Sequence, residues 1–161
     1  MKKRSAGILL YKFVNNNLQV LLVHPGGPYW KNKDENSWSI PKGEFQEDER
    51  AFDAALREFK EETGMELNSN KFIELSPVIQ NSGKIVYAWA VEGDIDAQSI
   101  WSNLYEIEWP PKSGKMQKFP EVDKAEWFPI PIARKKILKK QYGLIEELIN
   151  KLNLDKDKIK T

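Results

Sequence analysis

The sequence predicts an α/β protein, because short strand-like segments lie on both sides of one central amphipathic helix and a second helical segment stands near the C-terminus. The strand-like segments are rich in β-branched and aromatic residues and are bounded by Asn, Gly, Ser or Pro. The helical segments repeat apolar residues at three- and four-residue spacing. At 161 residues the chain is long enough for a substantial core, and we expect residues 1–161 to form one domain.

The N-terminal third is expected to form a β-hairpin followed by loops. Residues 5–13 and 19–24 are the two strands, and Asn15-Asn16-Asn17 between them is typical of a turn. The segments that follow are predicted from their Pro, Gly and polar content. They are a strand end at 25–28, a polar loop at 29–36, a short extended piece at 38–40 and a loop at 40–44 that leads into the helix.

The central helix is predicted to start at Glu47 or Asp48, where acidic residues favour the positive helix end, and to stop before Gly64. Glycine at that position permits a left-handed cap. An apolar stripe should face the core, and it consists of Phe52, Leu56 and Phe59.

The remaining elements follow from the same two patterns. We expect strands at 71–79 and 84–91 joined by a turn at 81–83, a strand at 103–109, a loop at 110–120, a short strand at 125–128, a helix at 132–152 with a break near Tyr142-Gly143, and a frayed tail at 155–161.

Three carboxylates on the central helix indicate which chemistry the protein could perform. Glu58, Glu61 and Glu62 stand at i, i+3 and i+4 and therefore share one face of a helix. Like charges this close repel each other unless a positive charge lies between them. A hard divalent cation, Mg²⁺ or Mn²⁺, suits a site made of carboxylates. The alternative interpretation is a solvated acidic helix face.

The spacing around these carboxylates is G-x5-E-x7-R-E-U-x-E-E-x-G-U, where U is a bulky apolar residue, and it runs from Gly43 to Met65. This segment resembles the Nudix box, with Phe59 as an aromatic at a U position. The resemblance implies an α/β/α sandwich with a mixed sheet and a central catalytic helix. It also implies that Gly43, Glu49 and Gly64 are structural.

The resemblance further implies roles for individual residues. The catalytic residues would be Glu58, Glu61, Glu62, Arg57 and Glu121, the last on a loop before the strand at 125–128. The metal ligands would be the same four glutamates and the backbone carbonyl of Lys42. Substrate contacts are expected from Lys42, Gly43, Arg4, Lys84 and Lys115. A glutamate such as Glu121 could also accept the proton of the attacking water.

The predicted activity is metal-dependent hydrolysis of a diphosphate bond in a nucleoside polyphosphate, or in a nucleoside diphosphate linked to another group. The segment Trp38 to Glu44, W-x-x-P-K-G-E, is similar to the dinucleoside-polyphosphate branch of the family. Two alternatives remain: an RNA 5′-end pyrophosphohydrolase that would use the basic residues at 134–140, and a catalytically inactive nucleotide-binding module.

The composition of the chain limits the classes of partner that we expect. A net charge of +1 gives no global field for nucleic acid, and no apolar run is long enough to span a membrane. The chain has no cysteine, which excludes thiol chemistry and disulfides. We therefore expect a cytoplasmic protein with a small nucleotide as its substrate, either a monomer or a homodimer. The single histidine, His24, is expected to have a structural role at its strand end.

Overall fold

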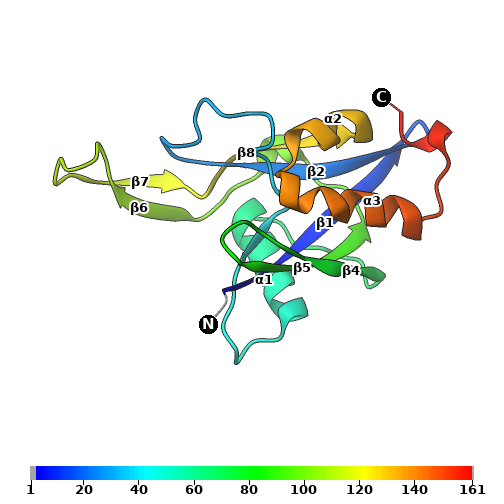
Figure 1. Ribbon diagram of the computed structural model, residues 1–161, viewed down its shortest axis with the longest axis horizontal. Helices are drawn as coiled ribbons and strands as arrows, with labels where there is room; N and C mark the ends of the chain where they lie inside the picture. The colour runs from blue at the N-terminus through cyan, green and yellow to red at the C-terminus, as the bar shows by residue number, and fades with distance from the viewer. Residues whose placement is uncertain (1–2, 161) are drawn as a thin grey trace.

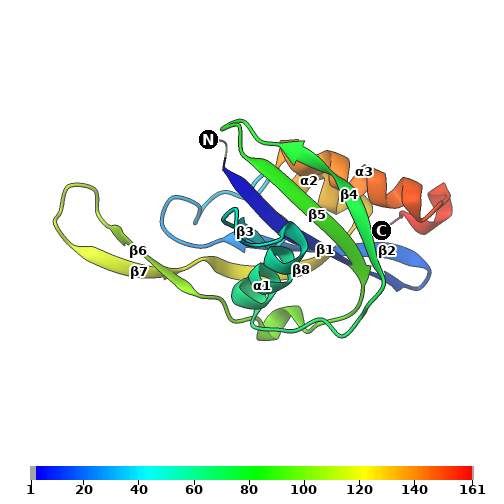
Figure 2. The ribbon, with the colours of Figure 1, turned by 90° about the horizontal axis from the view of Figure 1, so that it is seen from below.

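The computed structural model describes residues 3–160, and its centre is a mixed six-stranded sheet with helices on both faces (Figures 1 and 2). The strand order is β4-β5-β1-β2-β8, with β3 paired to β1. The bounds are β1 Arg4–Val14, β2 Asn17–Pro25, β3 Lys42–Glu44, α1 Ala51–Thr63, β4 Phe72–Ile79, β5 Ile85–Glu92, β6 Leu104–Glu108, β7 Met116–Pro120, β8 Val122–Pro129, α2 Ile130–Lys136 and α3 Tyr142–Lys151. Strands β1 and β5 are parallel and their neighbours antiparallel. The predicted α/β class and the mixed sheet are confirmed.

Strand β1 is buried on both faces, which explains its continuous apolar run. Ile8 and Leu10 belong to the cluster that packs around α1, whereas Leu9 and Tyr11 belong to the cluster around α2 and α3. Alternate side chains of a strand point to opposite faces, so a helix layer on each side demands apolar residues at every position. The sheet therefore separates α1, with its glutamates, from the two C-terminal helices.

Helix α1 starts later than predicted. Its N-cap is Arg50, whose side chain makes no capping hydrogen bond, and the predicted start at Glu47 or Asp48 is wrong. The preceding residues form a turn in which the Glu49 N–H donates to the Gln46 carbonyl at 3.1 Å. The predicted end is confirmed, because Gly64 caps the helix at φ 76° and its N–H donates to the Lys60 carbonyl.

Two segments predicted as loops are strands. Residues 42–44 form β3, which pairs with residues 5–7 of β1. Residues 116–120 form β7, which pairs with β6 in a separate hairpin. The Glu108 carboxylate accepts from the N–H groups of Lys112 and Gly114 at 3.1 and 3.0 Å, which closes the turn of this hairpin. The hairpin projects from the body of the molecule in both views (Figures 1 and 2).

The C-terminal helix breaks earlier than predicted, between α2 and α3, and Tyr142-Gly143 lie inside the first turn of α3. The fully buried Gln141 explains this position. Its Oε1 accepts from the Ile40 N–H at 3.0 Å and its Nε2 donates to the Ser39 Oγ at 3.0 Å. These bonds fix the connection against the segment that leads to β3.

The tail expected to be frayed forms a 3-10 turn at Lys156–Lys158, and Ile159 packs against the core; Thr161 lies outside the described residues. Among the described residues, no helix has the length and apolar character needed to cross a membrane.

Candidate active site

The glutamates of α1 face strand β3. Glu58 is 7% exposed, and its carboxylate packs directly on Gly43. A Cβ added to Gly43 would lie 1.9 Å from the Glu58 Oε2, so only glycine fits between strand and helix. Next to it, the backbone N–H of Lys42 donates to the Glu62 Oε1 at 3.2 Å. Strand β3, unforeseen in the sequence, thus holds Lys42 and Gly43 against the acidic face.

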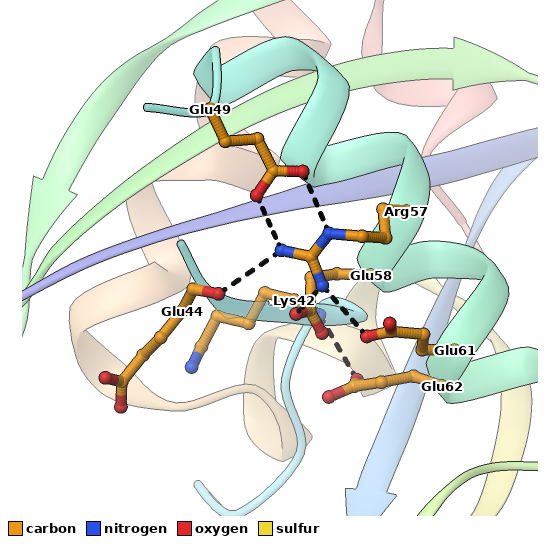
Figure 3. A network of polar contacts seen from close by, with 7 residues as sticks. All are labelled: Lys42, Glu44, Glu49, Arg57, Glu58, Glu61 and Glu62. Carbon is orange, nitrogen blue, oxygen red and sulfur yellow. Dashed lines mark hydrogen bonds and ion pairs between the residues drawn. The ribbon is translucent and has the colours of Figure 1, made fainter. Parts of the chain in front are cut away.

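Arg57 ties these carboxylates to the loop before the helix (Figure 3). It donates two hydrogen bonds to Glu49, at 2.9 and 2.8 Å. Its Nη1 donates to the Glu58 Oε1 at 2.8 Å and to the Glu61 Oε2 at 3.0 Å. The planar guanidinium suits several carboxylates at once. Arg57 is therefore an organiser of the acidic cluster.

Burial and crowding shift the protonation of the cluster. Burial raises the pKa of Glu58 to about 7, with Glu61 and Glu121 adding to the rise against the opposing effect of Arg57. Burial also raises the pKa of Glu62 to about 8, and the negative charges of Glu58 and Glu121 contribute. The pKa of Lys42 is lowered, first by burial and then by the nearby Lys84. A concentration of negative charge that favours bound protons also favours a bound cation.

Glu121 lies beside the α1 carboxylates although it is distant in sequence. Its N–H donates to the Asn103 carbonyl at 2.8 Å, and the Asn103 N–H donates to the Glu61 carbonyl at 3.1 Å. The Gly26 N–H in turn donates to the Glu121 carbonyl at 3.0 Å. The pKa of Glu121 is raised, first by burial and then by Glu61. Backbone bonds thus link Glu121 to α1 and to the end of β2.

Glu62, Lys42 and Glu121 line one cavity with a volume of about 280 Å³. Its full lining is Val23, Pro25, Trp30, Ser37, Ser39, Lys42, Glu62, Gln80, Glu121, Val122 and Leu138. We call it the active-site cavity. Sequence patterns gave no sign of Gln80, because it comes from a turn far from the box and carries no motif. Trp30 adds an aromatic side chain to this lining.

The carboxylates of Glu58, Glu61 and Glu62 are the kind of oxygen ligand that a hard divalent cation prefers. Their present orientations do not place three of them around one metal position. Within residues 3–160, no group of three or more histidine, aspartate or glutamate side chains is arranged to hold a metal ion. Arg57 explains this, because it engages one oxygen each of Glu58 and Glu61. Among the described residues, the other oxygen of each carboxylate accepts no protein hydrogen bond and remains available. Carboxylate oxygens of this kind are the ligands that Mg²⁺ and Mn²⁺ prefer.

The other residues predicted to contact the substrate lie in different parts of the structure, and only one of them lies near Lys42. Lys84 donates to the Glu44 carboxylate at 3.2 Å, near Lys42. The Arg4 guanidinium lies over the Phe45 ring, 4.8 Å from its centroid, and does not line the active-site cavity. Lys115 lies at the turn end of the projecting β6–β7 hairpin, away from α1 (Figures 1 and 2). The predicted role of Lys115 as a substrate contact therefore gains no support from its position in the hairpin.

His24 has the structural surroundings expected of it. The side chain is 1% exposed. Its Nδ1 lies 2.9 Å from the Asp123 Oδ1, and its Nε2 lies 2.6 Å from the Lys33 carbonyl. These contacts connect the loop after β2 to the start of β8, next to Glu121.

A family model described as the NUDIX domain matches residues 1–148. Among curated proteins, the chain is similar to mRNA-decapping enzyme subunit 2 of Saccharomyces cerevisiae, with 28% identity over 158 residues. The match covers 94% of this chain but only 14% of that protein. Nudix hydrolase 5 of Arabidopsis thaliana is 27% identical over 118 residues, which cover 73% of this chain and 34% of the relative. The chain thus spans a small part of the length of these relatives.

Solved structures share the fold. The NUDIX domain of Shewanella oneidensis NrtR complexed with ADP ribose aligns with a TM-score of 0.65 at 17% identity, covering 94% of this chain and 89% of that one. A C. elegans Ap4A hydrolase binary complex aligns with a TM-score of 0.59 at 19% identity, covering 94% and 98%. These likenesses show a common arrangement of sheet and helices.

Proposed function

Because the chain belongs to the Nudix family, we propose that its acidic site hydrolyses a diphosphate bond linking a nucleoside to another group, with the help of Mg²⁺ or Mn²⁺. One observation carries this proposal. The fold brings Glu121 and Lys42 to the carboxylate face of α1, around one cavity. A diphosphate needs both a cation site and a positive charge, and this arrangement supplies both.

A bound metal ion would neutralise the phosphate charge and make a water molecule more acidic. Glu58, Glu61 and Glu62 are the proposed ligands, and the Lys42 carbonyl and Glu121 stay predictions for the same role. The Lys42 ammonium would face a phosphate oxygen. Arg57 would hold Glu58 and Glu61 at a fixed separation through its paired contacts.

Glu121 is our candidate for the residue that accepts the proton of the attacking water. Its raised pKa supports this role, because a carboxylate with greater proton affinity is a better base. Its backbone bonds hold it beside Glu61 without constraining its carboxylate. The hydrogen bond of Lys42 to Glu62 similarly orients Glu62.

A second candidate substrate is the 5′ end of an RNA. The similarity to a yeast m7GpppN-mRNA hydrolase, 28% identical, favours it, as does the basic turn at 139–140. We place it second because two of the three basic residues at 134–136 are already paired, Arg134 with Glu146 and Lys136 with Asp34. Few cations then remain to follow an RNA backbone.

A substrate panel tests the proposal. Nucleoside triphosphates, ADP-ribose, dinucleoside polyphosphates, diphosphoinositols and capped or 5′-triphosphate RNA would be assayed with Mg²⁺, with Mn²⁺ and with excess chelator. We expect turnover of at least one nucleoside-linked diphosphate with metal and none with chelator. Metal-dependent binding without turnover of any substrate would point instead to an inactive binding module.

A further inference from the structure

A second cavity adjoins the active-site cavity and has a volume of about 390 Å³. The two cavities share Gln80 and Leu138 in their walls. Its lining residues are Asn36, Gln80, Asn81, Ser82, Leu138, Lys139 and Lys140. We call this cavity the lysine groove. It is formed by the turn between β4 and β5 on one side and by the connection between α2 and α3 on the other.

The lysine groove differs in charge from its neighbour. Its lining contains two ammonium groups and no carboxylate, whereas Glu62 and Glu121 line the active-site cavity. Within residues 3–160, neither Lys139 nor Lys140 takes part in an ion pair, although Lys136 close by is paired with Asp34. A path from one cavity to the other therefore runs from a cation-binding end to an anion-binding end.

Both walls of the lysine groove are held in place by the protein itself. Gln141 anchors the turn that carries the two lysines, through its bonds to Ile40 and Ser39. In the opposite wall, the Gln80 N–H donates to the Lys84 carbonyl and the Gly83 N–H to the Gln80 carbonyl, both at 2.9 Å. Because the backbone is fixed, binding there needs only the lysine side chains to become ordered.

Gln80 marks the boundary between the two cavities and has an unused polar atom. Its Oε1 is buried, and among the described residues it has no hydrogen-bond partner. A buried polar atom without a partner is costly, so a rotation of the Gln80 side chain that lets the amide reach the cavity and meet a ligand or a water is favourable. The amide can present either an oxygen or an NH₂ group, because rotation exchanges the two.

We propose that the lysine groove is a subsite for the distal phosphates of a substrate whose scissile diphosphate lies in the active-site cavity. This inference rests on the proposed function, and it specifies the substrate as a small molecule with an extended polyphosphate chain, such as a dinucleoside polyphosphate. Lys139 and Lys140 bind the additional phosphate oxygens, and Gln80 contacts the chain where it passes between the cavities. A short substrate such as ADP-ribose ends before the groove.

The test compares substrates of different length in two matched double variants. K139Q/K140Q removes both charges from the lysine groove. K156Q/K158Q removes two charges from exposed lysines that do not line it. Steady-state kinetics would be measured on ADP-ribose, on dinucleoside polyphosphates with two to five phosphates and on 5′-triphosphate RNA.

In K139Q/K140Q we expect kcat/KM for the four- and five-phosphate substrates to fall about tenfold, mainly through KM, as expected for lost charge-assisted contacts. Activity on ADP-ribose should stay within about twofold of wild type, and K156Q/K158Q should resemble wild type on every substrate. Gln80→Glu, which puts a negative charge at the boundary, should also penalise the longer substrates more strongly. Equal losses on all substrates, or no loss on any, would overturn the subsite.

Binding of inorganic tripolyphosphate, followed by calorimetry, separates this inference from the proposed function. If the wild type hydrolyses nothing in the series, the proposed function fails, yet weaker tripolyphosphate binding in K139Q/K140Q alone still supports the subsite. Unchanged binding in that variant overturns it. A loss confined to 5′-triphosphate RNA would overturn the assignment to a small molecule.

Discussion

The acidic face of α1 and the lysine groove lie side by side but are built in opposite ways. The acidic face comes from residues 42–62, which are close in sequence and are joined by Arg57. The lysine groove comes from three turns that are far apart in the chain. Local spacing therefore specifies the proposed metal-binding carboxylates of α1, whereas only the folded sheet assembles the part that would select a substrate.

The largest effect should come from a proposed metal ligand. Glu62→Gln keeps the size of the side chain but removes its charge, so we expect kcat to fall by at least about 100-fold with the fold retained. Hydrolysis of the best panel substrate and circular dichroism would be measured together. Glu66→Gln is the matched control, because Glu66 is exposed and pairs only with Lys60 in the described structure. A near-normal rate in Glu62→Gln would remove Glu62 from the site.

A smaller effect is expected at Glu121, which lies beside the α1 carboxylates and lines the active-site cavity. Glu121→Gln removes the proposed proton acceptor but keeps a polar side chain. We expect kcat to fall about 100-fold, the lower end of general-base contributions, with KM changed by less than about threefold. Steady-state kinetics across pH would check this. A change in KM alone would make Glu121 a substrate contact and not a base.

The smallest effect concerns stability in the absence of metal. Burial raises the pKa of Glu58 to about 7 and that of Glu62 to about 8, both above the ordinary value of 4.5. The folded state therefore binds these protons more tightly than the unfolded state, so their stabilising contribution is present at low pH and is lost as pH rises through 7 to 8. In chelator, the melting temperature should decline between pH 5 and pH 8.5.

The matched comparison for this pH effect is Glu62→Gln, which cannot lose a proton. Its melting temperature should decline less over the same range, and saturating Mg²⁺ should abolish the decline in the wild type. A melting temperature that rises with pH in chelator would contradict the raised pKa values of Glu58 and Glu62.

Sequence patterns predicted α1 well because its periodicity and its glycine cap are local properties. They missed β3 and β7, since neither segment has a strand-like composition. Strand β3 can pair with β1 because Gly7 leaves room for the Pro41 carbonyl and the Lys42 side chain, and β7 exists because Glu108 closes its turn. The break before α3 was misplaced because a buried side chain, Gln141, determines it through contacts distant in sequence.

The candidate site shows the same difference between local sequence patterns and contacts that are distant in sequence. Helical spacing identified the three glutamates of α1, the resemblance to the Nudix box identified Arg57, Glu49 and Gly43, and the structure brings these residues together. Glu121 was identified from its place before a strand, not from any periodicity. Lys115 was expected among the substrate contacts, whereas the pairing of β6 with β7 places it at the turn end of their hairpin. The lysine groove had no sequence signal, because no motif connects its three turns.

Direct binding of Mn²⁺ tests the central claim, that the α1 carboxylates form a metal site. Electron paramagnetic resonance would follow free Mn²⁺ during titration of the wild type, of E61Q/E62Q and of the control Glu66→Gln, without any substrate. We expect the wild type and Glu66→Gln to bind Mn²⁺ equally, and E61Q/E62Q to bind it at least about tenfold more weakly, as expected for two lost carboxylate ligands. Equal affinity in all three proteins would contradict a metal site on α1.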